Sequence, residues 1–120
     1  MEHDSHLKKF QKELSAGTVA LVLLAVLDQA VEPMYGYQIA KRLERSGEGL
    51  LGGKQSALYP VLRNLDTAGL LASDVEPSMA GPPRRYYRIT EPGREVLKAW
   101  IGHWNSTRDF VETTLKGTPQ

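Results

Sequence analysis

The chain has 120 residues, of which 41% are hydrophobic and 24% are charged, and 15 basic side chains face 14 acidic ones. This length fits one compact domain, and the composition excludes a wholly disordered chain. The chain has no cysteine, which excludes disulfides, thiolate metal sites and a cysteine nucleophile. Because the formal net charge is only +1, a nucleic-acid site would have to come from the local placement of charges.

Three helices are predicted in the first half of the chain. Each is indicated by apolar residues spaced three or four positions apart, which share one helical face. The predicted helices cover residues 5–29, 35–46 and 54–68. The first is apolar on all sides from Val19 onward, which is typical of a buried helix.

A hairpin and a fourth helix are predicted in the second half. Residues 70–76 and 85–90 are typical of strands, and the Pro- and Gly-rich residues 77–83 between them predict a hairpin with a long, flexible tip. Thr90 can cap a last helix over residues 91–115, and the end of the chain is expected to fray. The order of elements predicts an α+β, mostly α fold: a winged helix-turn-helix with an N-terminal helix and a C-terminal dimerisation helix.

This order also predicts how the chain is divided. We expect residues 1–90 to form the winged-helix domain with its N-terminal helix, residues 91–116 to form the dimerisation helix, and residues 117–120 to form a tail. The longest apolar run, Val19 to Leu27, is shorter than the roughly 18 residues of a membrane-spanning helix. The polar start of the chain is not typical of a secretory signal. We therefore expect a cytoplasmic protein with no membrane partner.

Polar residues on two of the predicted elements indicate a nucleic-acid site. In a helix-turn-helix, the second helix of the pair enters the major groove and its first residues approach the base edges. Lysine and arginine can neutralise phosphates, whereas glutamine and arginine can read adenine and guanine edges. The predicted DNA contacts on the third helix and the hairpin are Lys54, Gln55, Ser56, Tyr59, Arg63, Arg84, Arg85 and Tyr86.

Plainer interpretations stand beside this one. Taken alone, Arg63 and Arg84 are equally compatible with solvated surface charges, since most arginines are exposed. Tyr59 has the character of a half-buried aromatic residue. Strand alternation predicts that Tyr87 belongs to the core.

Four short segments, in this order and spacing, resemble the PadR family of transcriptional regulators. They are Tyr35-Gly36-Tyr37-Gln38-Ile39, residues 57–66 (ALYPVLRNLD), Gly69-Leu70-Leu71 and residues 84–94 (RRYYRITEPGR). The resemblance covers residues 17–104, and Asn64-Leu65-Asp66 stands where the family has Arg-Leu-Glu. It implies the smaller subtype with a single C-terminal helix. It also implies a repressor that dimerises through its first and last helices, and that some members release DNA on binding small aromatic molecules.

The last predicted helix carries two tryptophans on an apolar face. A small domain has little room to bury both, so we predict a homodimer interface. The alternative is that both tryptophans pack against the first helix of the same chain. The predicted interface residues are Leu97, Trp100, Ile101, Trp104 and Val111. Trp100 and Trp104, with Phe110, could also stack a flat aromatic effector between two subunits.

Catalysis is not expected. The histidines His3, His6 and His103 are scattered, and no metal-binding spacing or phosphate-binding glycine motif is present in the sequence. We predict a sequence-specific DNA-binding regulator, a repressor, with no cofactor and no metal. The alternative is a winged-helix protein-interaction module that does not bind DNA, and the hairpin arginines favour the first interpretation.

Overall fold

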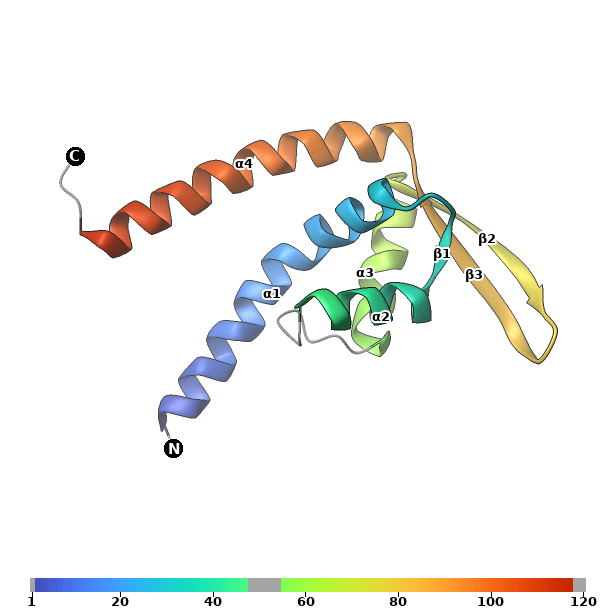
Figure 1. Cartoon of the computed structure of the whole chain (residues 1–120), viewed down its shortest axis with the longest axis horizontal. Coiled ribbons are helices and arrows are strands. Elements are labelled where there is room, and N and C mark those ends of the chain that lie inside the picture. Colours follow the sequence, from blue (N-terminus) through green and yellow to red (C-terminus); the bar gives the residue numbers. More distant parts are fainter. Residues whose placement is uncertain (1, 48–54, 118–120) are drawn as a thin grey trace.

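The computed structural model describes residues 2–47 and 55–117. It has a mostly helical fold with a small antiparallel sheet (Figure 1). The elements in chain order are α1 (Glu2–Gln29), β1 (Met34–Tyr35), α2 (Gly36–Gly47), α3 (Gln55–Thr67), β2 (Leu71–Ser78), β3 (Gly81–Ile89) and α4 (Glu91–Lys116). The predicted winged-helix arrangement is confirmed, and each of its helices lies within a few residues of its predicted bounds.

The sheet contains one strand that the sequence did not indicate. Its order is β1-β3-β2, and β3 pairs with both neighbours in antiparallel fashion. Strand β1 has only two residues and pairs Met34 with Tyr87 and Tyr35 with Tyr86. Alternation along β3 turns Tyr87 and Ile89 into the core, as predicted for Tyr87.

The prediction of a long loop at the hairpin tip is wrong. Strand β2 runs through Ser78 and β3 begins at Gly81, so residues 79–80 alone make the turn. The prolines did not break the strands, because the φ angle of proline is compatible with an extended backbone. Pro77 falls where the pairing register shifts between Glu76 and Ser78, a position that needs no ladder hydrogen bond.

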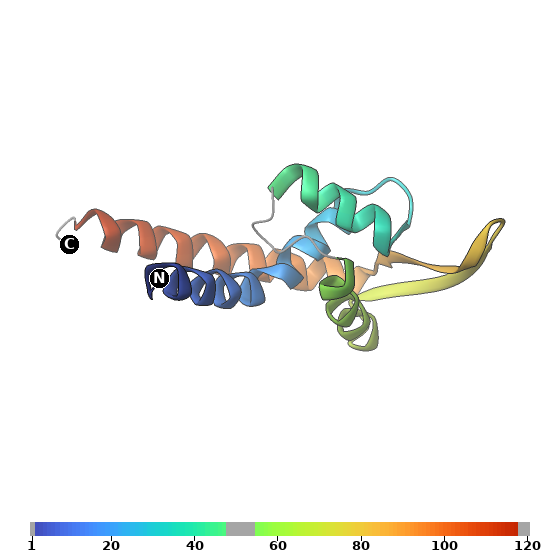
Figure 2. The same ribbon diagram turned by 90° about the horizontal axis from the view of Figure 1, so that it is seen from below.

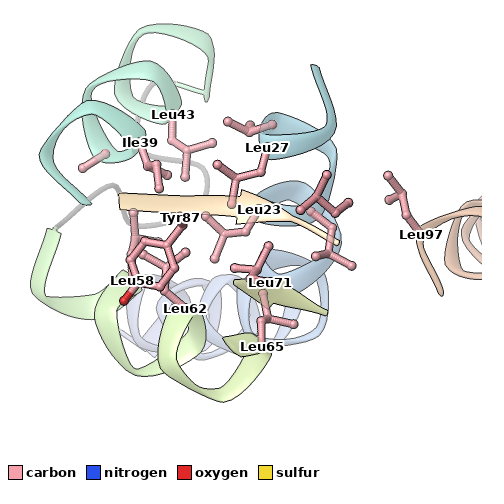
Figure 3. Close-up of a cluster of buried hydrophobic side chains, with 14 residues drawn as sticks. Leu23, Leu27, Ile39, Leu43, Leu58, Leu62, Leu65, Leu71, Tyr87 and Leu97 are labelled. Carbon is pink, nitrogen blue, oxygen red and sulfur yellow. The ribbon is translucent and has the colours of Figure 1, made fainter. Parts of the chain in front are cut away.

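The core lies where α1, α2, α3 and the sheet meet (Figure 3). Its fully buried side chains are Leu23, Leu24, Ile39, Leu58, Leu62 and Leu71. By length and composition α1 could cross a membrane. Its C-terminal half contributes Leu23, Leu24, Val26 and Leu27 to the core.

The outer parts of α1 and α4 extend beyond this core. They diverge toward their ends, whereas the β2–β3 hairpin, which we call the wing, projects from the opposite end of the molecule (Figures 1 and 2). Apolar side chains on the outer half of α1 are half exposed, with Leu7 at 55%, Phe10 at 60% and Leu14 at 52%. The single chain therefore leaves apolar surface on both long helices.

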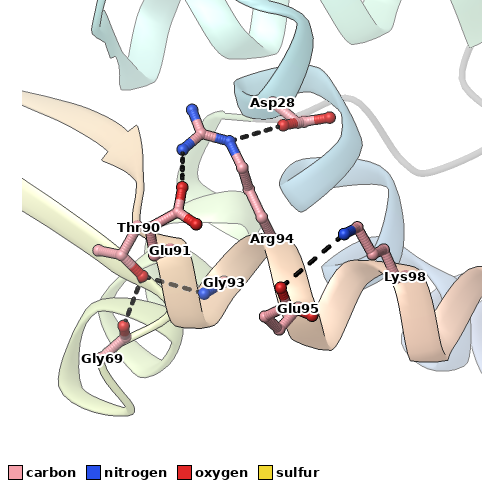
Figure 4. A network of polar contacts seen from close by, with 8 residues as sticks. All are labelled: Asp28, Gly69, Thr90, Glu91, Gly93, Arg94, Glu95 and Lys98. Carbon is pink, nitrogen blue, oxygen red and sulfur yellow. Dashed lines mark hydrogen bonds and ion pairs between the residues drawn. The ribbon is translucent and has the colours of Figure 1, made fainter.

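A set of contacts fixes the start of α4 against the domain (Figure 4). The Thr90 hydroxyl donates to the Gly69 carbonyl over 2.7 Å and accepts from the Gly93 amide over 3.0 Å. Arg94 pairs with Asp28 of α1 at 3.1 Å and with Glu91 at 2.8 Å. A Cβ atom at position 93 would overlap the Leu70 carbonyl oxygen, so only glycine allows this approach. The exposed ion pairs add little stability, so the close approach at Gly93 and the burial of Leu97 one turn later hold the start of the helix against the domain.

Candidate nucleic-acid interface

An open hollow of about 440 Å³ lies between α3 and the wing. It is lined by Tyr59 and Arg63 from α3 and by Arg84 and Arg85 from β3, with Tyr35 at its edge. Three guanidinium groups from two elements thus gather around one concave surface. Guanidinium groups and tyrosine hydroxyls are suited to binding phosphate oxygens.

The α3 side of the hollow is built by helical periodicity. Leu58 and Leu62 are buried, which turns Tyr59 and Arg63 outward, one helical turn apart. The Tyr59 ring lies against Gly36, where a Cβ atom would overlap its Cε1 carbon. Glycine at the start of α2 therefore sets the position of the tyrosine.

The DNA contacts predicted at the first turn of α3 lie at the edge of the described part of the chain. Lys54 lies outside the described residues. Gln55 and Ser56 belong to the first turn of α3, but their side chains lie outside the described part of the chain. All three stay predictions.

The two adjacent wing arginines have different surroundings. The Arg85 Nη1 donates to Ser73 Oγ over 3.0 Å, and that hydroxyl donates to Asp66 Oδ2 over 2.5 Å. This relay ties the wing to the end of α3. The Arg84 guanidinium instead stacks on the Tyr35 ring, 4.5 Å from its centroid. Arg84 is thus better placed than Arg85 to bind an outside anion.

The structure does not bring Tyr86 into this hollow. Tyr86 instead lines a second hollow, with three carboxylates (Glu32, Asp74 and Glu76) and one guanidinium, that of Arg88. Its ring meets the Tyr35 ring edge-on at 5.3 Å. An acidic neighbourhood disfavours phosphate, so the geometry gives Tyr86 a supporting role beneath Tyr35.

Sequence reasoning missed a row of alternating cations and rings beside the hollow. The Lys41 ammonium lies 5.6 Å from the Tyr37 ring, and Tyr37 stacks on Tyr35 at 6.3 Å. Arg84 closes the row on the other side of Tyr35. The Tyr35-Gly36-Tyr37 spacing was visible in the sequence, but only the β1–β3 pairing shows that it meets the wing.

Tyr87 lies buried behind this surface. Burial raises the pKa of its hydroxyl above the ordinary 10.0, and nearby Arg85 offsets part of that effect. The folded state therefore keeps its proton at a pH where the unfolded chain begins to lose it. This contribution to stability is complete below pH 10.0 and is lost as the pH rises through the folded pKa.

We therefore expect Tyr87→Phe to flatten the alkaline loss of stability. Between about pH 9 and about pH 11 the parent should lose more unfolding free energy than the variant, because phenylalanine cannot ionise. Urea denaturation at the two pH values measures the difference. Equal losses in the two proteins would contradict the assignment.

An apolar groove of about 480 Å³ lies between α1 and α4. Leu14 and Leu21 line it from α1, and Trp100 and Trp104 line it from α4. Both tryptophans thus face the first helix of their own chain, which was the alternative interpretation. Trp104 nevertheless keeps 37% of its surface exposed.

The predicted interface residues on α4 divide into two groups. Leu97 is only 4% exposed and belongs to the core of its own chain, so it has little surface to offer to a partner. Its assignment to the interface is corrected for this reason. Trp100 is half-buried against the core, whereas Ile101 and Val111 are 42% and 44% exposed.

These features define the class of the protein: a winged-helix domain with arginines between its third helix and its wing, and with long helices at both ends. The chain belongs to the PadR-like family of transcriptional regulators, which it matches over residues 23–99. The resemblance noted in the sequence is therefore confirmed. This family consists of transcriptional regulators and not of enzymes.

Several solved structures share the fold. A PadR family transcriptional regulator from Eggerthella lenta is 33% identical, with a TM-score of 0.83 over 98% of this chain and 99% of that one. A PadR-like transcriptional regulator from Bacillus cereus is 26% identical, with a TM-score of 0.73 over 88% of this chain and 99% of that one. A protein of Lysinibacillus sphaericus known only as uncharacterized protein X is 22% identical over 82% of this chain and 87% of its own length.

Proposed function

We propose that the chain is a sequence-specific DNA-binding repressor of the cytoplasm that acts as a homodimer and is released from DNA by a small aromatic effector. One observation carries the proposal: Arg63 and Arg84 face a common hollow between α3 and the wing. A duplex strand placed there would meet a cation on each side. Phosphate contacts of this kind supply most of the affinity in DNA binding.

The hollow has the position that a winged helix uses on DNA. With α3 in the major groove, one phosphate backbone would pass between Arg63 and Arg84 while the wing reaches the neighbouring groove. The Bacillus subtilis PadR, solved in complex with operator DNA, shares this fold at 20% identity and a TM-score of 0.62 over 70% of this chain and 46% of that one. It supports the view that this architecture can hold a duplex.

The homodimer is supported by the apolar surface of the long helices. Phe10 on α1 is 60% exposed, and Phe110 on α4 is 72% exposed. Removing such surface from water stabilises an assembly by about 25 cal/mol per Å² of apolar area. In this proposal residues 1–90 form the DNA-binding domain, residues 91–116 join the subunits, and residues 117–120 are a tail.

The effector part rests on the groove between α1 and α4. Trp100 and Trp104 line it, and its surface is mostly apolar although Glu13 and His103 also reach it. Flat aromatic molecules stack on indole rings. An effector that binds better to one angle between subunits would shift the spacing of the two α3 helices. Release from DNA, and thus relief of repression, would follow from that shift.

We expect Arg84→Ala to lower DNA affinity by about tenfold and to reduce the slope of log affinity against log salt by about 1, because one phosphate contact is lost. Arg88→Ala is the matched control, since Arg88 lines the second hollow and not the one beside α3. Gel-shift titrations over a salt series on a genomic fragment retained by the protein measure both quantities. Equal behaviour of the two variants would remove Arg84 from the interface.

The same experiment distinguishes DNA binding from the alternative function, that of a winged-helix protein-interaction module. A protein-interaction module would retain no genomic fragment at physiological salt. In that case the arginines of the hollow would be solvated surface charges.

A further inference from the structure

The tip of the wing presents one apolar side chain to solvent. Residues 79–80 form the turn, and Met79 is fully exposed there. The wing projects away from the body of the molecule, and no other described helix or strand reaches this end (Figure 2). No charged residue occurs anywhere from Pro77 to Pro83.

The tip stands on a stiff base. Ser78 pairs with Gly81 directly beneath the turn, and prolines occupy positions 77, 82 and 83. Each proline fixes its own φ angle and so removes freedom that binding would otherwise have to suppress. The backbone on both sides of Met79 is therefore restricted, so that the residue stands at a protruding end of a paired hairpin.

The length of the wing suits the depth of the minor groove. Arg84 lies three strand residues behind Gly81, or about 10 Å at the usual strand rise, and this exceeds the groove depth of about 7.5 Å. The wing is a two-stranded ribbon up to its turn, so it enters a groove about 6 Å across only where that groove is widened, as in deformed DNA. In a widened groove the turn reaches the floor while Arg84 stays near the phosphates.

The chemistry of the wing matches as well. Proteins that bend DNA from the minor groove place arginines along the groove and insert an apolar side chain, often methionine or proline, between base steps. The wing has this order of groups, with arginines at its base and a thioether at its tip. Ala80, the other residue of the turn, has a much smaller side chain, so Met79 would be the first to contact the bases.

Resting on the DNA binding proposed above, we propose that Met79 is a wedge that the wing inserts from the minor groove between two stacked base pairs, opening that step and kinking the duplex. The step that it opens would be a pyrimidine–purine step, since these unstack at the lowest cost. In a dimer, each half-site would carry one such step. Met79 is then a specificity-determining residue that reads deformability rather than base edges.

The test uses the full chain and a duplex selected by it from a random-sequence pool. 2-Aminopurine, which fluoresces more strongly when unstacked, is placed in turn at each position flanking the site. The parent protein should raise the fluorescence at one step in each half-site. Met79→Leu should keep this rise, and Met79→Ala should lose most of it while affinity falls by no more than about tenfold, because the phosphate contacts remain. Since Met79 packs on nothing, all three proteins should melt at the same temperature.

The possible results separate the two proposals. A tight complex whose fluorescence rise is the same with methionine and alanine at position 79 would overturn the wedge alone. Failure of the parent to select any duplex would overturn DNA binding and the wedge together. Loss of the rise with alanine but not with leucine supports the wedge, because both variants keep the backbone and the arginines of the wing.

Discussion

Replacing Gly93 by alanine is expected to lower the free energy of unfolding by about 3 kcal/mol, at the upper end of the range for overpacking. The added Cβ would overlap the Leu70 carbonyl oxygen and crowd Ile89 Cγ1, and neither atom belongs to the end of a flexible side chain. The start of α4 must therefore move away from the turn between α3 and β2. Urea denaturation measures the loss.

Gly102→Ala is the matched control for this variant. It lies in the same helix, and nothing lies within 4 Å of a Cβ at that position. Alanine is the better helix former by up to about 1 kcal/mol, so this variant should be as stable as the parent or more so. If the two alanine variants were equally stable, the close approach at Gly93 would not be what holds α4.

Trp104→Glu is expected to convert a dimeric parent into a monomer at micromolar concentration and to lower operator affinity by about 100-fold or more, because avidity from the second half-site is lost. Trp104 is the better choice than Trp100, which is half-buried against the core of its own chain. A charge at position 104 would stand on the exposed part of the apolar face. Light scattering measures the assembly, and gel shifts measure the affinity.

Ser106→Glu adds the same charge on the opposite side of α4. Its angle from position 104 is about 200° around the helix, so it should stay dimeric and bind DNA like the parent. A Trp104→Glu protein that remained a stable dimer would place the subunit interface elsewhere. A monomeric parent would remove the interface altogether.

Helices α2, α3 and α4 could be predicted well because each has a clear apolar period. In α3, Leu58, Leu62 and Leu65 recur every three or four residues. The short turn at the hairpin tip could not be predicted, because proline and glycine usually indicate a loop. No local feature of the sequence shows that the strands continue through these residues. Strand β1 exists only because β3 pairs with it, so two residues carried no signal of their own.

The candidate site shows the same division. The sequence alone indicates that arginines lie at the base of the wing. It does not show that Arg84 and Arg85 have different surroundings, because these depend on residues of neighbouring strands. Arg85 is tied to Ser73 because that residue lies across the sheet, and Asp66 joins them from the end of α3. Leu97 was misassigned for a related reason: helical periodicity finds the apolar face of α4 but not where the core of the chain ends along it.

The anchored start of α4 gives this small protein a lever. The helix has 26 residues, which at the usual rise is about 39 Å, so a rotation of about 5° at its root displaces its far end by about 3 Å. The whole molecule is 58 Å long, and the wing lies on the other side of the same pivot (Figure 1). A shift of a few ångströms where the far ends of two such helices are held together would therefore turn each winged domain about this pivot. The wing would move by less than the far end of α4 does, because its arm is the shorter of the two.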